Sequence, residues 1–192
     1  TVVSKIIDNC AYIGTNGFVV DNVNYGTNNT TPCISELYED LKIIKDKKCS
    51  NVMMEVSSEA LLHDRVKNIK YDIVGFTNIT GDHLNVHKTF DNYIECKLKL
   101  LNYLKEDGIC VFKCQATITS ARQLMTPEYS WLMATSCGFY TLDQFFLLAK
   151  NRLHSGKIKK QQHARKFTST IYVFKKTDKK KEIIKKDENN NV

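Results

Sequence analysis

The chain has 192 residues, of which 42% are apolar, and this length argues for one hydrophobic core with an appendage rather than two full domains. No apolar run approaches the ~18 residues of a membrane span, and the N-terminal residues lack the pattern of a secretory signal. The seven cysteines form no Cys-x-x-Cys pair, and their odd number argues against a disulfide framework. We therefore expect a cytoplasmic protein with reduced thiols and no membrane partner.

The net charge of +7 comes entirely from the C-terminal residues. Residues 1–149 carry 14 Lys and Arg against 17 Asp and Glu, whereas the remaining residues carry 14 against 4. Such a basic tail is more often a solvated segment than a nucleic-acid arm, and no groove-reading helix or aromatic platform accompanies it. We therefore predict no specific nucleic-acid binding.

Residues 1–114 alternate short apolar runs with amphipathic stretches, which is the pattern of βαβ units. This pattern predicts an α/β fold with three layers and a mostly parallel sheet. The first expected elements are a helix over residues 2–7, strands joined by a tight turn over 11–20, a loop over 22–32 and a helix over 34–45. Ile34, Leu37, Leu41 and Ile44 recur at helical spacing in the last of these.

Two brief apolar runs, residues 51–56 and 73–79, are the clearest strands. A helix follows over residues 89–105, with Thr89 as its N-cap and Gly108 beyond its end. Residues 109–112 then supply another strand. The apolar face expected for the helix consists of Phe90, Ile94, Leu98, Leu101 and Leu104.

The chain beyond Cys114 is harder to assign. Residues 142–153 have helical periodicity and residues 167–174 alternate like a strand, but no repeating unit connects them. We therefore divide the chain into a domain over residues 1–114, an unassigned and partly helical segment over 115–163, and a basic tail over 164–192 with a strand or hairpin. The middle segment fits divergent sequence, a frameshifted reading or a fusion equally well.

Polar residues that follow the two clearest strands are the first candidates for function, because ligands of open parallel sheets bind beyond the carboxyl ends of the strands. Glu55 lies at the end of the first strand, and the second strand leads to His83. If these strands are neighbours, a carboxylate and an imidazole meet in one crevice that suits a divalent cation. Taken alone each residue is weak evidence, and His83 and His87 fit two ordinary polar histidines equally well. Lys97 lies on the expected apolar face of its helix, where it either extends to solvent or meets an anionic partner.

Five ordered segments change the balance between these alternatives. They are residues 29–32 (NTTP), residues 54–58 (MEVSS), Arg65, residues 76–87 (FTNITGDHLNVH) and residues 93–97 (YIECK). In order and spacing they resemble the motifs NTTP, EVSSHAL, FTNLxxDHLDxHG and YxxAK of the Mur ligases, most closely those of the MurE type (UDP-MurNAc-tripeptide synthetases). The resemblance implies the central ATP-binding domain of a peptidoglycan precursor ligase, which adds an amino acid to UDP-MurNAc-L-Ala-D-Glu.

The resemblance also implies roles for the matching residues, with ATP and Mg²⁺ as cofactors. The residues that would contact the UDP-MurNAc-dipeptide are Asn29, Thr30, Thr31, Ser57 and Arg65. Glu55 and His83 would hold magnesium, and a carbamylated Lys97 would support a second magnesium ion. The substrate carboxylate would attack the γ-phosphate of ATP to give an acyl phosphate, from which the incoming amine displaces phosphate.

The chain departs from the family pattern in several places. The P-loop GTxGKTT would lie directly before Thr1, so the residues that bind ATP are not identified. Glu59, His63 and Lys88 replace the usual His, Gln and Gly, and the Asn-x-Asp-Asp stretch and the amino-acid-selecting domain are missing after Cys114. We therefore expect a monomeric fragment or degenerate copy that does not turn over alone. The alternative is a noncatalytic protein that binds a sugar nucleotide or nucleic acid.

Overall fold

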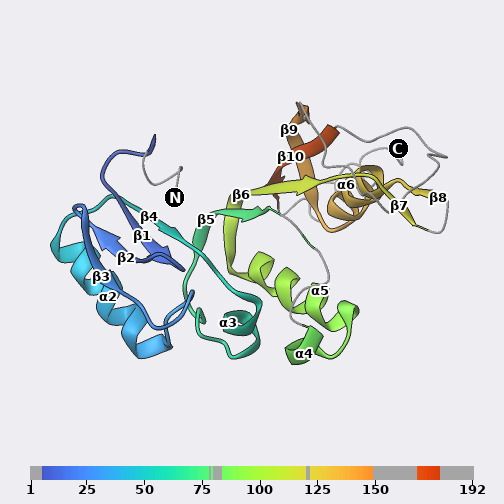
Figure 1. Cartoon of the computed structure of the whole chain (residues 1–192). Coiled ribbons are helices and arrows are strands. Elements are labelled where there is room, and N and C mark those ends of the chain that lie inside the picture. Colours follow the sequence, from blue (N-terminus) through green and yellow to red (C-terminus); the bar gives the residue numbers. More distant parts are fainter. Residues whose placement is uncertain (1–5, 78, 80–83, 120–121, 149–167, 178–192) are drawn as a thin grey trace, which may run out of the picture. The chain divides into compact units, whose positions relative to one another are not determined.

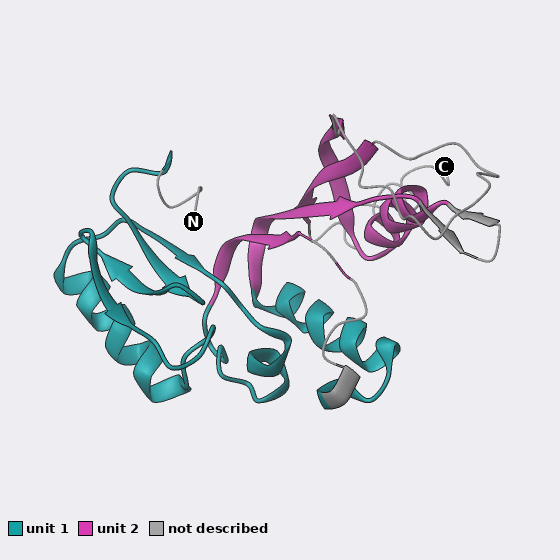
Figure 2. Ribbon diagram, in the orientation of Figure 1, with its two compact units in different colours: residues 1–69, 81–103 teal, residues 70–80, 104–192 magenta. Residues whose placement is uncertain are grey.

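The computed structural model describes residues 6–77, 79, 84–119, 122–148 and 168–177 (Figure 1). The chain divides into two compact units (Figure 2). Unit 1 comprises residues 1–69 and 81–103, and unit 2 comprises residues 70–80 and 104–192. Most of the predicted helix over residues 2–7 lies outside the described residues, as does His83.

Unit 1 contains a four-stranded sheet in the order β3-β2-β1-β4. Its strands are β1 (Cys10–Gly14), β2 (Gly17–Val20), β3 (Val23–Gly26) and β4 (Asn51–Met54). β1 and β2 pair antiparallel across a tight turn, which confirms the paired strands predicted there. β1 and β4 pair parallel, because helix α2 (Ile34–Asp46) carries the chain back between them.

Strand β3 occupies part of the segment that was predicted to be a loop. Asp21 and Asn22 both have positive φ, 52° and 63°, which is the conformation of a two-residue type I′ hairpin turn. This turn pairs Val20 with Val23 and so adds β3 to the edge of the sheet. The loop prediction was therefore wrong for residues 23–26, because two short polar residues are enough to reverse the chain here, and it is confirmed for residues 27–32.

Helix α2 confirms the prediction over residues 34–45. Leu37 and Ile44 are buried, whereas Ile34 is 44% exposed, so the buried stripe is narrower than the sequence pattern indicated. Figure 1 shows the helix lying along the sheet of unit 1, whose central strand β1 is almost entirely buried. This packing supplies the core on which the ends of β1 and β4 are fixed.

The remaining helices of unit 1 are α3 (Ser58–Leu62), α4 (Leu84–His87), α5 (Phe90–Leu98) and the 3-10 helix η1 (Lys99–Tyr103). The predicted N-cap is confirmed, since the Thr89 hydroxyl accepts a hydrogen bond from the Asn92 amide at 3.2 Å. The helical segment ends at Tyr103 and a strand begins at Leu104, so Gly108 does not terminate the helix as predicted.

The buried face of α5 also differs from the predicted one. Tyr93 and Cys96 are buried, whereas Phe90 and Leu98 are 42% and 40% exposed. The Cys96 thiol donates to the Ser58 carbonyl at 3.1 Å, so the side of α5 that carries Tyr93 and Cys96 is the one packed against α3. Packing against α3 therefore buries a face of α5 next to the one that the pattern of apolar residues predicted.

Unit 2 contains a second sheet in the order β5-β6-β10-β9. Its elements are β5 (Tyr71–Phe76), β6 (Leu104–Cys114), the paired strands β7 (Thr117–Thr119) and β8 (Arg122–Leu124), α6 (Thr126–Ser136), β9 (Phe139–Leu148) and β10 (Thr168–Lys176). β5 and β6 pair parallel, and β6, β10 and β9 pair antiparallel. Both sheets are mixed, which corrects the prediction of a mostly parallel sheet: among the described strand pairs only β1–β4 and β5–β6 are parallel. The fold is α/β as predicted, and the three-layer arrangement stays a prediction.

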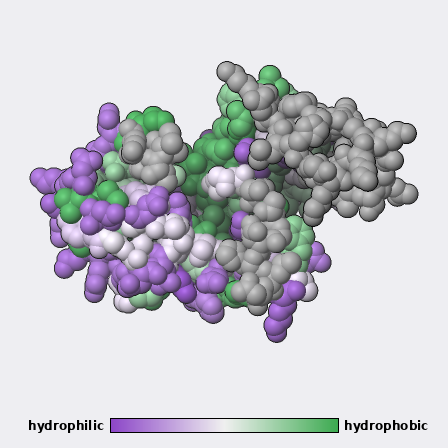
Figure 3. Space-filling view, viewed as in Figure 1, coloured by the Kyte–Doolittle hydropathy of each residue, from purple (hydrophilic) through white to green (hydrophobic). Residues whose placement is uncertain are grey.

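Strand β9 replaces the helix predicted over residues 142–153, of which residues 149–153 lie outside the described part. The strand pairs with β10 along its whole length, from Phe139 opposite Lys176 to Leu148 opposite Thr168. Gly138, at φ 85°, lets the chain leave α6 and enter the strand. Long-range pairing with β10 thus overrode the local pattern, and apolar side chains of β9 remain exposed, as the green surface over this strand shows (Figure 3). β10 itself confirms the strand predicted over residues 167–174.

The longest helix in the described part of the chain is α2, with 13 residues. None of the helices described here has the length and apolar character needed to cross a membrane.

Candidate functional site

Glu55 lies at the carboxyl end of β4, where its backbone amide continues the parallel pairing by donating to the Ile13 carbonyl at 2.8 Å. Its side chain meets the turn between β1 and β2. Oε1 accepts a hydrogen bond from the Tyr12 hydroxyl at 2.8 Å, and Oε2 accepts two from Thr15, from the amide at 3.1 Å and the hydroxyl at 2.8 Å. Three donors from β1 and its turn therefore fix the orientation of the carboxylate.

These donors also hold Glu55 in its charged form. Burial alone would raise the pKa of Glu55, but the hydrogen bonds from Thr15 and Tyr12 outweigh it and bring the pKa below its ordinary value. Gly14 is needed for this arrangement, because a Cβ at that position would lie 2.8 Å from the Glu55 Cδ atom. The result is a partly buried carboxylate that is ionised at neutral pH.

The hydrogen bonds that Glu55 accepts leave room for a magnesium ion. A carboxylate offers about four lone-pair sites. Thr15 uses both sites of Oε2 and Tyr12 uses one of Oε1, so one site on Oε1 remains. A single carboxylate oxygen combined with water is the usual protein contribution to a Mg²⁺ site. Glu55 can therefore serve as one ligand.

The second predicted magnesium ligand, His83, lies outside the described residues. β4 pairs with β1 and β5 pairs with β6, so the two strands expected to present Glu55 and His83 are not paired with each other in the described structure. Within that part of the chain, no three His, Cys, Asp or Glu residues are grouped as metal ligands. The convergence of Glu55 and His83 stays a prediction.

Thr31 links the segment before α2 to the end of β4. Its hydroxyl donates to the Glu55 carbonyl at 2.9 Å and accepts from the Ser57 amide at 2.9 Å. The residue has no exposed surface. Its side chain is thus placed to organise the site from inside, and the predicted contact of Thr31 with the substrate stays a prediction.

The other predicted substrate residues gather around Thr31. Ser57 caps α3 by accepting a hydrogen bond from the Ala60 amide at 3.1 Å, and the Arg65 guanidinium donates to the Thr31 carbonyl at 3.2 Å. The Thr30 hydroxyl lies 3.1 Å from that of Thr15, which binds Glu55. One hydrogen-bonded group, the Thr31 cluster, therefore contains Thr15, Thr30, Thr31, Glu55, Ser57 and Arg65. Asn29 stands beside it, and its backbone carbonyl accepts from the Thr27 hydroxyl at 2.8 Å.

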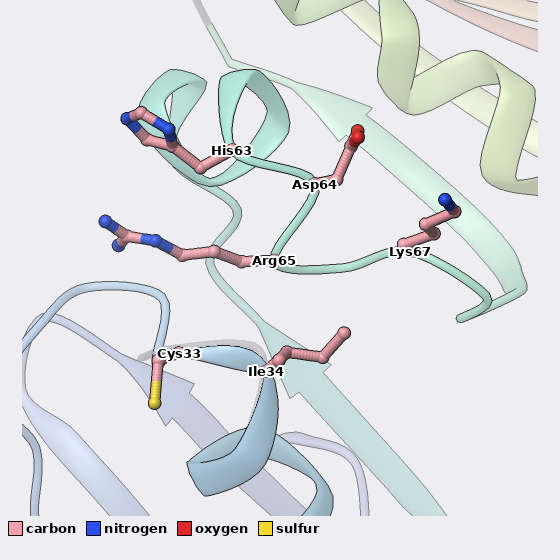
Figure 4. Close-up of a pocket in the computed structure, with 6 residues that line it drawn as sticks. All are labelled: Cys33, Ile34, His63, Asp64, Arg65 and Lys67. Atoms are coloured by element: carbon pink, nitrogen blue, oxygen red, sulfur yellow. The ribbon is translucent and has the colours of Figure 1, made fainter.

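An open hollow of about 560 Å³ adjoins the cluster and is lined by Cys33, Ile34, His63, Asp64, Arg65 and Lys67. Figure 4 shows the side chains of His63 and Arg65 extending to the same side. Lys and Arg outnumber Asp in this lining, so the hollow favours an anionic group. At its edge Cys33 precedes α2, and hydrogen bonds from the Ser35 hydroxyl and the Glu36 amide lower the pKa of its thiol.

Lys97 is half-buried on α5, with its ammonium nitrogen 4.8 Å from the centre of the Tyr93 ring. This is a cation–π arrangement, worth about 0.5–1 kcal/mol at a partly exposed site. His87 is buried with its Nε2 2.9 Å from the Ser58 hydroxyl, so the structure favours an ordinary core histidine at this position. The proposed carbamylation of Lys97 stays a prediction.

Sequence reasoning missed Tyr12 and Thr15 as partners of Glu55. The segment Gly14-Thr15-Asn16-Gly17 was recognised as a strand turn. Pairing β1 in parallel with β4 would have placed this turn next to Glu55, since parallel neighbours end at the same edge of a sheet. The missing signal was thus the strand order.

Comparison with known protein families identifies the family of this chain. Residues 1–167 match the Mur ligase middle domain, and the chain belongs to this family. The match continues beyond residue 114, where the predicted domain ends.

Among curated proteins, the chain is similar to UDP-N-acetylmuramoyl-L-alanyl-D-glutamate–L-lysine ligases of staphylococci. It is 36% identical to that of Staphylococcus aureus (strain COL) and 38% identical to that of Staphylococcus epidermidis (strain ATCC 12228), in each case over 103 residues. These regions cover 54% of this chain and 21% of each relative, so the chain matches about a fifth of their length. A putative methyltransferase from Thermoplasma acidophilum aligns with 89% of this chain and 83% of its own, at 14% identity and a TM-score of 0.36, which is too low to carry an argument.

Proposed function

We propose that this chain forms the substrate-binding and magnesium-binding part of a MurE-type ligase, which uses ATP to add an amino acid to UDP-MurNAc-L-Ala-D-Glu. The observation that carries the proposal is the Thr31 cluster. Residues of separate sequence motifs meet there in one hydrogen-bonded group, which Thr15 completes, although up to 35 positions separate these motif residues in the chain. Membership of the Mur ligase family and the names of the staphylococcal relatives support the same activity.

Each part of the cluster has a distinct task in this proposal. Arg65 attracts the anionic groups of the UDP-MurNAc-dipeptide into the hollow, while Thr30, Asn29 and Ser57 supply neutral polar contacts at its side. Thr31 sets the relative positions of these groups from inside the protein. The site therefore acts mainly by holding the substrate carboxylate in place.

The cofactors of this proposal are ATP and Mg²⁺. Glu55 and His83 would hold one ion and carbamylated Lys97 would support another, and bound magnesium would neutralise charge on the phosphates of ATP. Tyr12 and Thr15 keep the Glu55 carboxylate ionised and turned toward one side.

The proposal places the protein in the cytoplasm as a monomer. All seven cysteines are free thiols, which agrees with a reducing compartment.

Isothermal titration calorimetry with UDP-MurNAc-L-Ala-D-Glu tests the proposal. The unaltered chain should bind, Arg65→Ala should weaken binding at least about tenfold because a charge-assisted contact is lost, and Arg65→Lys should fall between them. Lys42→Ala, on the exposed side of α2, is the matched control and should bind normally. If the unaltered chain gives no heat of binding, or if Arg65→Ala binds as tightly, the proposed site is wrong. Submicromolar, sequence-selective nucleic-acid binding at physiological salt would instead support the noncatalytic alternative.

A further inference from the structure

Thr15 stands between two parts of the site that the sequence motifs treat separately. Its hydroxyl lies 2.8 Å from Oε2 of Glu55 on one side and 3.1 Å from the Thr30 hydroxyl on the other. Its backbone amide makes a second bond to the same Glu55 oxygen at 3.1 Å. The turn after β1 therefore connects the carboxylate at the end of β4 to the segment that precedes α2.

The number of available hydrogen atoms sets the direction of this connection. An ionised carboxylate only accepts hydrogen bonds, and a threonine hydroxyl has one hydrogen to donate. The Thr15 hydrogen is directed to Glu55, so the bond between the two hydroxyls must use the hydrogen of Thr30. The hydrogen bonds run from Thr30 to Thr15 to Glu55, and they leave the lone pairs of the half-buried Thr30 oxygen for a ligand.

We propose that Thr15 is a positioning residue that ties the substrate-contacting Thr30 to the Glu55 carboxylate through this directed pair of hydrogen bonds. The inference rests on the proposed function for the roles of Thr30 and Glu55. Thr30 and the Glu55 carboxylate therefore move together, because the Thr15 hydroxyl fixes residues 27–31 relative to the end of β4.

A valine at position 15 isolates this effect. Thr15→Val keeps the shape of the side chain and the backbone amide bond to Glu55, and the Tyr12 bond to Oε1 also persists. The substitution removes the two bonds of the hydroxyl, to Glu55 Oε2 and to Thr30, and with them the link between these residues. Thr15→Ser retains the hydroxyl and should behave like the unaltered chain. Lys42→Ala, on the exposed side of α2, changes neither bond and serves as the control.

The first measurement is hydrogen–deuterium exchange of the amides of residues 27–31 in the full chain without ligand. Loss of the hydrogen bond to Thr30 should speed exchange about fivefold in Thr15→Val, with little change in Thr15→Ser and Lys42→Ala. The second is calorimetric binding of UDP-MurNAc-L-Ala-D-Glu, which should weaken by a similar factor in Thr15→Val alone.

The two measurements separate this inference from the proposed function. If the unaltered chain does not bind the UDP-MurNAc-dipeptide, the proposed function fails, while the exchange result still decides whether Thr15 holds the segment. Unchanged exchange in Thr15→Val overturns the inference, and so does a Thr15→Ser variant that is as impaired as Thr15→Val. Faster exchange confined to Thr15→Val, with serine restoring protection, supports it.

Discussion

Replacing Thr31 with valine keeps the outline of the side chain but removes the hydroxyl that joins Glu55 to Ser57. In the structure this hydroxyl donates to the Glu55 carbonyl and accepts from the Ser57 amide, both at 2.9 Å. The side chain has no exposed surface, so water does not reach the valine to replace it. Two backbone groups therefore lose a partner at once.

A net contribution near 1 kcal/mol for each bond, partly offset by the greater apolar surface of valine, gives an expected loss of about 1–2 kcal/mol in the free energy of unfolding. Urea denaturation followed by far-UV circular dichroism measures this loss, and hydrogen exchange of the Ser57 amide locates it. Thr31→Ser is the control, since it keeps the hydroxyl and loses only a methyl group. If Thr31→Val is as stable as Thr31→Ser and the Ser57 amide remains protected, the hydroxyl does not organise the site.

Three further predictions concern other groups of unit 1. Burial raises the pKa of Asp40 from 3.8 to about 6, and the charges of two neighbouring glutamates add to this effect. The contribution of Asp40 to stability is therefore largest below pH ~4 and is lost as the pH rises through 6. Urea denaturation at different pH values measures this loss in the free energy of unfolding, which is at most about 3 kcal/mol. Asp40→Asn should remove the loss, whereas Asp46→Asn, at an exposed position, should not. The lowered pKa of Cys33 predicts faster alkylation by iodoacetamide at neutral pH than at the exposed Cys137, and equal rates by mass spectrometry would refute this. With ¹³C-bicarbonate, a carbamate NMR signal should be seen and should vanish in Lys97→Met, and its absence at saturating bicarbonate would remove the carbamylation assignment.

The elements of unit 1 were largely predictable because their signals are local. The spacing of Leu37 and Ile44 predicted α2, and Thr89 marked the start of α5. Which stripe of α5 is buried depended on its contact with α3, which no local pattern contains. β9 shows the same limit more strongly, because pairing with β10, about 30 residues later in the chain, decided between helix and strand.

The candidate site was predictable as a set of residues but not as an arrangement. Motif order selected Glu55, Ser57 and Arg65, and the structure joins them around Thr31. The inward role of Thr31 and the bonds from Thr15 to Glu55 depend on the parallel pairing of β1 with β4. Sequence spacing does not specify that pairing, so these two roles emerged only from the fold.

Amide chemical-shift mapping by NMR shows whether the Thr31 cluster binds the UDP-MurNAc-dipeptide. On titration of the ¹⁵N-labelled chain with UDP-MurNAc-L-Ala-D-Glu, we expect the largest shifts at the amides of Thr30, Ser57 and Arg65, with smaller shifts elsewhere in unit 1. No shifts at saturating ligand, or shifts confined to unit 2, would contradict it.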